Sequence, residues 1–177
     1  ALLKKHRPRR PINGVLLGIS LADLLQWSQP ERDAHAQAIR QRVQELYSAF
    51  RVRCPIYVLF MKADLVAGFT EFFADLGKEG REQVWGATFH FDPAPDAPLS
   101  LTALPGELEA LVARVDQHLL GRLQAERDPR RRALVFSFPR QFAALGETIE
   151  RFLADTLDAT RYEARPLVRG VYFTSGT

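Results

Sequence analysis

Apolar runs of strand length alternate with helical patterns over the first half of the chain. The strand-like runs lie near residues 13–19, 56–61 and 84–89. Runs of this length without polar alternation are typical of strands that are buried on both faces of a parallel sheet. Between the runs, apolar side chains recur at helical spacing over residues 39–50 and 69–76. The pattern predicts a β-α-β-α-β unit with three parallel strands and helices on both faces of the sheet.

Helical periodicity dominates the second half of the chain. Apolar stripes from Leu108 to Leu123 and from Phe142 to Leu153 predict two long amphipathic helices. Residues 132–138, between the stripes, are compatible with a strand or a helix, and residues 169–177 are typical of a short strand followed by a turn. We therefore expect an α/β domain over residues 1–91, a proline-rich linker over 92–103 and a helical extension over 104–177.

The composition is that of a globular protein, with 46% hydrophobic and 25% charged residues in a chain of 177. The single cysteine, Cys54, excludes an intrachain disulfide and fits a reducing compartment. No uncharged apolar run approaches the roughly 18 residues of a membrane span, and no signal peptide is recognisable. Because the chain starts at Ala1 rather than at methionine, we expect it to be a fragment of a longer protein.

Basic side chains are clustered in two places of a chain whose net charge is +3. Lys4 and Lys5 belong to the first cluster, and Arg130, Arg131 and Arg132 belong to the second. Such runs are either solvated loops or contact sites for an acidic protein or lipid headgroups. Nucleic acid is not expected as a partner, because no stacking aromatic side chains are interleaved with the arginines. The five residues are candidate partner contacts.

No motif for catalysis or metal binding is recognisable. A phosphate-binding loop requires G-x-x-x-x-G-K-[ST], and the sole Gly-Lys pair, Gly77-Lys78, is followed by Glu79. The histidines lack the spacing of metal ligands; they are His6, His35, His90 and His118. Cys54 stands at the start of a strand and is expected to be buried rather than nucleophilic. We therefore expect no catalytic residue and no metal site.

A Lys-x-Asp sequence, Lys62 to Asp64, follows the second predicted strand. In GTPase-type folds the aspartate of such a sequence accepts two hydrogens from the guanine edge, and the lysine stem packs along the base. Met61 stands where those proteins usually carry Asn or Thr, so one polar contact is missing. Ligands of parallel sheets bind at the carboxyl ends of the strands, where residues 86–88 are also expected. The residues are either a base-binding corner or ordinary strand-end residues.

Five stretches of the chain together resemble the cytoplasmic region of the IcmF/TssM proteins, which are inner-membrane components of the type VI secretion system. They are LLKKHRPRRPINGVLLGISLADLL, CPIYVLFMKADLVAGF, VWGATF, FPRQFAAL and RGVYFTSGT. The stretches occur in the order and with the spacing of the family, and the resemblance covers nearly the whole chain.

The resemblance implies a partial GTPase-like (P-loop NTPase-type) α/β fold, with a parallel sheet and flanking helices followed by a helical extension. Lys62 and Asp64 match the base-binding positions of the family, and Thr88 belongs to its loop after the last strand. The phosphate-binding loop would lie upstream of Leu2. We therefore expect no cofactor in this chain, although its parent could bind GTP or ATP with magnesium.

The functional expectation is a non-catalytic scaffold of a membrane-anchored parent. It would dock membrane-complex subunits to the baseplate on the cytoplasmic side of the inner membrane. The alternatives are a nucleotide-switched module whose phosphate-binding half lies upstream, and an α/β domain with another ligand.

Overall fold

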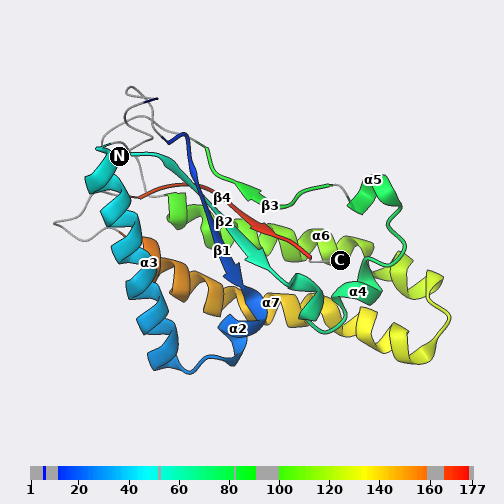
Figure 1. The fold of residues 1–177 in the computed structure, drawn as a ribbon. Coiled ribbons are helices and arrows are strands. Elements are labelled where there is room, and N and C mark those ends of the chain that lie inside the picture. Colours follow the sequence, from blue (N-terminus) through cyan, green and yellow to red (C-terminus); the bar gives the residue numbers. More distant parts are fainter. Residues whose placement is uncertain are drawn as a thin grey trace.

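The computed structural model describes residue 6 and residues 12–51, 53–81, 83–90, 100–158 and 166–175. These residues form a four-stranded sheet and a set of helices that pack against it (Figure 1). The strands are β1 (Val15–Ser20), β2 (Pro55–Met61), β3 (Trp85–Thr88) and β4 (Leu167–Phe173). The α-helices are α2 (Leu21–Gln26), α3 (Gln29–Phe50), α4 (Phe69–Phe72), α5 (Lys78–Arg81), α6 (Leu104–Ala125) and α7 (Pro129–Leu157). Two 3₁₀ turns are η1 (Ala63–Leu65) and η2 (Ser100–Ala103).

The sheet is mixed, with the strand order β1-β2-β4-β3. β1, β2 and β4 are parallel, whereas β3 pairs antiparallel with β4, with Trp85 opposite Phe173. The predicted parallel orientation is confirmed for the first two strands and is wrong for the third. A parallel strand requires a crossover that returns the chain to the starting edge of the sheet. The helical segments between β2 and β3 are too short for such a crossover, since α4 spans only about 6 Å at 1.5 Å per residue. The turn η1 also stays at the end of β2, because the Ala63 N–H donates a hydrogen bond to the Thr174 carbonyl oxygen. β3 therefore starts from the edge at which β2 ends and runs back.

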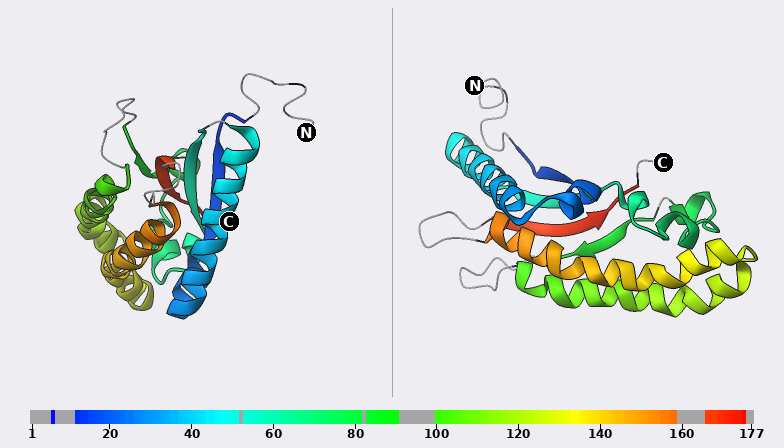
Figure 2. Two further views of the ribbon diagram at one scale, coloured as in Figure 1. Left: turned by 90° about the vertical axis from the view of Figure 1, so that its left-hand side faces the viewer. Right: turned by 90° about the horizontal axis from the view of Figure 1, so that it is seen from below.

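The three long helices, α3, α6 and α7, lie on one face of the sheet (Figure 2). On that face Ile56, Val58 and Phe60 of β2 are fully buried. On the other face Leu16 is 70% exposed and Met61 is 40% exposed. The prediction of helices on both faces is therefore wrong for the described part of the chain. The outer face is apolar in sequence, which explains why the strands were expected to be buried on both sides.

The two long helices are confirmed as α6 and α7, and the ambiguous residues 132–138 are helical. α7 begins at a favourable sequence, because the Asp128 carboxylate accepts a hydrogen bond from the Arg130 backbone N–H at 2.8 Å and Pro129 occupies the first turn. Further along α7, Phe142 packs against Trp85, with ring centroids 4.6 Å apart. α7 thus connects the helical part of the chain to the sheet.

β4 follows α7 in sequence but lies between β2 and β3, so strands from both sides of the predicted linker form one sheet. Residues 92–99 of that linker lie outside the described residues. The division into residues 1–91, 92–103 and 104–177 stays a prediction.

Candidate functional site

The carboxyl edge of β1 and β2 carries the predicted Lys-x-Asp corner. Lys62 adopts a left-handed backbone conformation with a φ of 62° immediately before η1. Its Nζ lies 3.8 Å from Oδ1 of Asp23, and both side chains are about half exposed. Ser175 Oγ donates a hydrogen bond of 3.1 Å to Oδ1 of Asp64. Both predicted residues are therefore at the same edge, and each has a polar neighbour from a distant part of the sequence, Asp23 of α2 for Lys62 and Ser175, which follows β4, for Asp64.

Thr88 lies far from this corner. Because β3 runs antiparallel, Thr88 faces Gly170, which pairs with Tyr57 near the start of β2. At about 3.3 Å per residue, Thr88 and Lys62 are roughly 16 Å apart along the strands. The Thr88 hydroxyl is instead within 2.7 Å of the Tyr172 hydroxyl. The expectation that residues 86–88 lie at the carboxyl edge with Lys62 is wrong, and the reason is the reversed strand.

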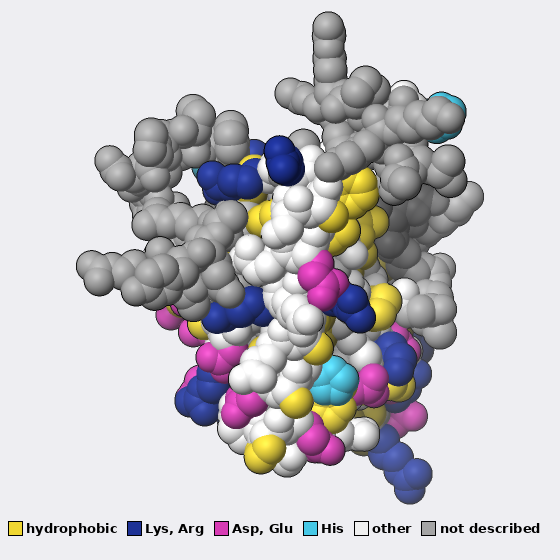
Figure 3. All heavy atoms as spheres, turned by 60° about the vertical axis from the view of Figure 1, so that its left-hand side comes forward, with side chains coloured by type: hydrophobic (Ala, Val, Ile, Leu, Met, Phe, Trp, Pro, Cys, Tyr) yellow, Lys and Arg dark blue, Asp and Glu magenta, His cyan; other side chains and the backbone are white. Residues whose placement is uncertain are grey.

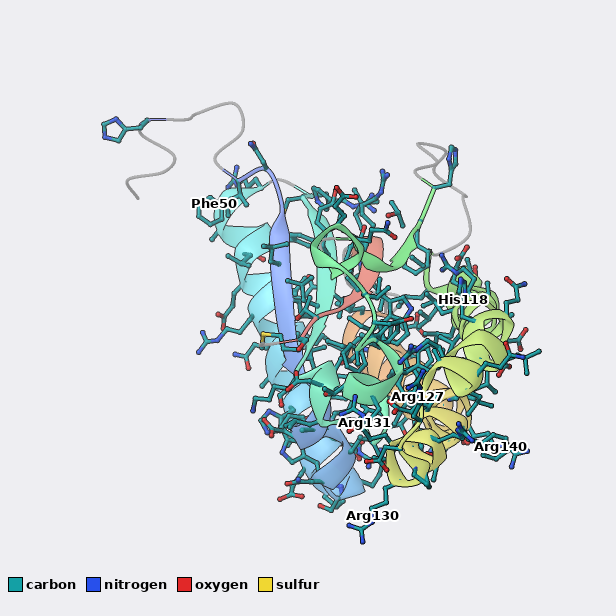
Figure 4. All side chains as sticks on the ribbon, turned by 90° about the vertical axis from the view of Figure 1, so that its right-hand side faces the viewer. Phe50, His118, Arg127, Arg130, Arg131 and Arg140 are labelled. Atoms are coloured by element: carbon teal, nitrogen blue, oxygen red, sulfur yellow. The ribbon has the colours of Figure 1, made fainter. Side chains whose placement is uncertain are left out.

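The arginine cluster lies at the turn between α6 and α7. Arg131 Nε forms a 3.0 Å ion pair with Glu126, and Arg132 donates to the Glu126 carbonyl oxygen through Nε and Nη2 at 2.9 and 2.6 Å. The backbone N–H of Asp128 and the Arg131 side chain together lower the pKa of Glu126. Arg130 extends away from the body of the protein (Figure 4). Two of the three arginines therefore support the turn, and Arg130 is presented to solvent.

Lys4 and Lys5, the other candidate contacts, lie outside the described residues. Figure 3 shows the face of the molecule on which α3 lies, and basic and acidic side chains are interspersed there. The positive net charge is therefore not gathered into one patch on that face.

Groups that could support catalysis are dispersed. Cys54 is buried, as expected, and burial raises the pKa of its thiol, which disfavours the nucleophilic thiolate. The His35 ring stacks on the Trp27 ring, with the ring centroids 3.9 Å apart. His118 Nδ1 lies 2.8 Å from the Arg114 carbonyl oxygen. In the described residues no group of three or more His, Cys, Asp or Glu side chains could hold a metal ion. Every described helix is too short or too polar to span a lipid bilayer.

Two hollows lie away from the Lys-x-Asp corner, on either side of the exposed face of α7. The larger, of about 380 Å³, lies between α6 and α7. Its charged lining is wholly acidic and consists of Glu109, Asp116, Glu147 and Glu150. The smaller, of about 150 Å³, lies between the first turn of α3 and the second half of α7, and Arg151 is among its lining residues. This surface was not predicted from the sequence, although the charges of α7 recur at helical spacing.

A buried arginine was also missed. Arg122 of α6 is 8% exposed and contacts the end of α4. A signal was present, because Arg122 follows Val115 by two helical turns and therefore falls on the apolar stripe of its helix.

Comparison with known proteins gives one family and one close relative. The family model of the IcmF-related N-terminal domain matches residues 1–177. The chain is 54% identical over 176 residues to a Pseudomonas aeruginosa protein described as "Type VI secretion system component TssM1". The match covers 99% of this chain and 16% of that protein, so the chain spans about a sixth of the relative's length. No solved structure matches the chain.

Proposed function

Because the chain belongs to the IcmF-related N-terminal domain family, we propose that it is a non-catalytic docking module of a type VI secretion component. In this proposal it belongs to a membrane-anchored protein, lies on the cytoplasmic side of the inner membrane, and links membrane-complex subunits to the baseplate. The observation that carries the proposal is the 54% identity, over nearly the whole chain, to a protein described as a secretion component.

Exposed surfaces of the described residues support a docking role. The apolar outer face of the sheet is partly open, with Leu16 and Met61 exposed. Parallel strands are normally covered on both faces, so such a face is typical of a contact surface. The turn between α6 and α7 adds an exposed positive charge at Arg130. These features support binding to other proteins of the secretion system.

Reversing the charge of Arg130, Arg131 and Arg132 to glutamate is expected to weaken binding to a purified baseplate or membrane-complex subunit at least fivefold. In this proposal the partner surface is acidic, so glutamates at these three positions would repel it. The repulsion weakens binding, mainly through a slower association rate. The measurement is a titration of each purified subunit against the chain by biolayer interferometry. Reversal of Arg42, Arg53 and Arg114, three exposed arginines elsewhere, changes the net charge equally and serves as the control.

The triple reversal also removes the contacts to Glu126. We expect a loss of about 1–2 kcal/mol in the free energy of unfolding, which a urea titration measures. Equal binding by the triple reversal and its control would exclude the arginine cluster from the interface. Failure of the unaltered chain to bind any subunit would contradict the docking function itself.

A second candidate function is a nucleotide-switched, GTPase-like module. The observation that favours it is the position of Lys62 and Asp64 at the carboxyl edge of two parallel strands. Under this hypothesis GTP or ATP with magnesium would bind the longer protein to which the chain belongs. Lys62 and Asp64 would lie beside the base, and a segment upstream of this chain would supply the phosphate-binding loop. Thr88 would take no part, because it lies near the other end of the strands.

The isolated chain is expected to have no measurable affinity for GTP or ATP in the presence of magnesium. The sequence has no G-x-x-x-x-G-K-[ST] loop, so the phosphates would meet no backbone N–H cradle and no motif lysine. Isothermal titration calorimetry with each nucleotide is the measurement, and adenosine or guanosine alone tests the base site separately. Micromolar binding that Asp64→Asn abolishes would favour the nucleotide-switched function over the docking module.

A further inference from the structure

The exposed ridge of α7 has a pattern that is complementary to itself. It is formed by Phe136, Arg140, Ala143/Ala144, Glu147 and Arg151, which fall within an arc of about 100° at 3.6 residues per turn. All of these residues are exposed, including Phe136, which is an apolar side chain with 51% of its surface in solvent. Arg140 extends away from the protein (Figure 4).

The order of side chains along this ridge allows two copies to pair. Arg140 and Glu147 are equally far from the midpoint between Ala143 and Ala144, and so are Phe136 and Arg151. If two α7 helices pack antiparallel about that midpoint, each Arg140 faces the Glu147 of the other copy. Each Phe136 ring likewise faces the other Arg151, a favourable cation–π arrangement. A two-fold axis creates both pairs twice.

The surroundings of the ridge fit this arrangement. The small residues Ala143 and Ala144 at its centre permit two helix backbones to approach closely. Gly146 lies beside them, and a Cβ added to it would have only Glu150 Oε1 within 4 Å, at 3.9 Å. The hollows on either side give room for the side chains of a second helix. The larger hollow is acidic, so an arginine that enters from a second copy gains a favourable charge environment.

The existing contacts within one copy leave these groups accessible. Arg140 lies over the Phe136 ring of its own helix at 5.7 Å, and Arg151 pairs with Glu147 at 3.1 Å. The side chains of Arg151 and Glu147 are nonetheless 60% and 84% exposed. An exposed pair of this kind contributes little by itself. We propose that the chain forms a symmetric dimer through α7, with the ridge of one copy packed antiparallel on the ridge of the other.

Sedimentation equilibrium of the unaltered chain tests the proposal first. We expect a reversible dimer with a dissociation constant of about 10–300 μM, since interfaces of one helix pair lie at the small end of protein contacts. Dimerisation should weaken as salt is raised, because the pairs are electrostatic and exposed. A chain that stays monomeric up to about 1 mM contradicts the proposal.

Charge reversal tests the symmetry of the pairing. Arg140→Glu and Glu147→Arg are each expected to weaken the dimer at least tenfold, because each places two like-charge contacts in a homodimer. An equimolar mixture of the two variants should restore dimerisation to within about threefold of the unaltered chain, since both contacts are then oppositely charged. The chain that carries both reversals should dimerise equally well. Arg114→Glu, an exposed reversal on α6, should have no effect. Failure of the mixture to recover would overturn the antiparallel arrangement.

A steric pair of variants completes the test. Gly146→Leu fills the space beside the ridge and is expected to abolish dimerisation, whereas Gly121→Leu on α6 should leave it unchanged. Both glycines are helical, and Gly121 has no atom within 4 Å of an added Cβ. Equal dimerisation by the two variants would show that the ridge is not the interface.

Discussion

Replacing Gly68 with alanine is expected to lower the free energy of unfolding by about 2–4 kcal/mol. Gly68 has a φ of 86° at the start of α4, a left-handed conformation that strains any residue with a Cβ. An added Cβ would also lie 2.4 Å from the Leu134 carbonyl oxygen and 3.0 Å from Cβ of Phe138, both on α7. Backbone atoms of α7 cannot move aside as the end of a flexible side chain can, so α4 and α7 would be forced apart.

Urea unfolding monitored by circular dichroism measures this loss. Gly121→Ala is the matched control, because Gly121 lies in the interior of α6 and has open space around it. That substitution should stabilise the chain by about 0.5–1 kcal/mol through a better helix propensity. A Gly68→Ala chain as stable as the unaltered one would show that α4 does not lie this close to α7 in solution.

Helices and strands could be located from the sequence because their periodicity is local. The stripe from Leu108 to Leu123 is sufficient to predict α6, and the apolar run before Lys62 is sufficient to predict β2. Residues 132–138 were ambiguous because aromatic and β-branched residues are found in both kinds of element. The helix start at Asp128-Pro129 decides the outcome in favour of α7.

The path of the chain between elements was harder to predict. The orientation of β3 depends on α4 ending at Phe72, whereas helical spacing had been found over residues 69–76. It also depends on β4 inserting between β2 and β3 from the far end of the chain. Neither event is visible in a window around residues 84–89. The separation of Thr88 from Lys62 follows directly from this reversed strand.

The candidate surfaces differ in how far the sequence reveals them. The position of Lys62 and Asp64 at the carboxyl end of β2 was predicted correctly, since it depends only on where this strand ends and not on the topology. The ridge of α7 is encoded by spacing within one helix, from Phe136 to Arg151, and could have been found by examining its charges for internal symmetry. The open face of the sheet depends on which helices cover the strands, and this is a property of the tertiary fold.

Removing the guanidinium of Arg122 is expected to lower the free energy of unfolding by about 2–4 kcal/mol. Arg122 Nε donates to the Phe72 carbonyl oxygen at 2.7 Å, and Nη2 donates to the Glu71 carbonyl oxygen at 2.9 Å. Nη1 also forms a 2.8 Å ion pair with Asp75. The arginine thus provides hydrogen-bond donors for the backbone carbonyls at the end of α4. A carbonyl left without a donor where water is excluded would lower the free energy of unfolding.

Three substitutions separate the carbonyl contacts from the ion pair. Arg122→Met keeps much of the buried stem but removes every donor, so it should show the full loss. Arg122→Lys keeps the charge but has a single compact ammonium, which cannot replace the planar fork of donors; about half of the loss is expected. Asp75→Asn should cost less than about 1 kcal/mol, because the Asp75 side chain is 51% exposed.

Hydrogen exchange locates the effect within the chain. Arg122→Met should accelerate exchange at the amides of Phe72 and Phe73, which donate to the Gly68 and Phe69 carbonyls, before the rest of the fold is affected. The amides of β1 and β2 should stay protected to the global limit. If Asp75→Asn costs as much as Arg122→Met, the ion pair rather than the carbonyl contacts holds α4 on α6. The carboxylate would then be the residue that fixes this short helix, and with it the segment that follows Lys62 and Asp64.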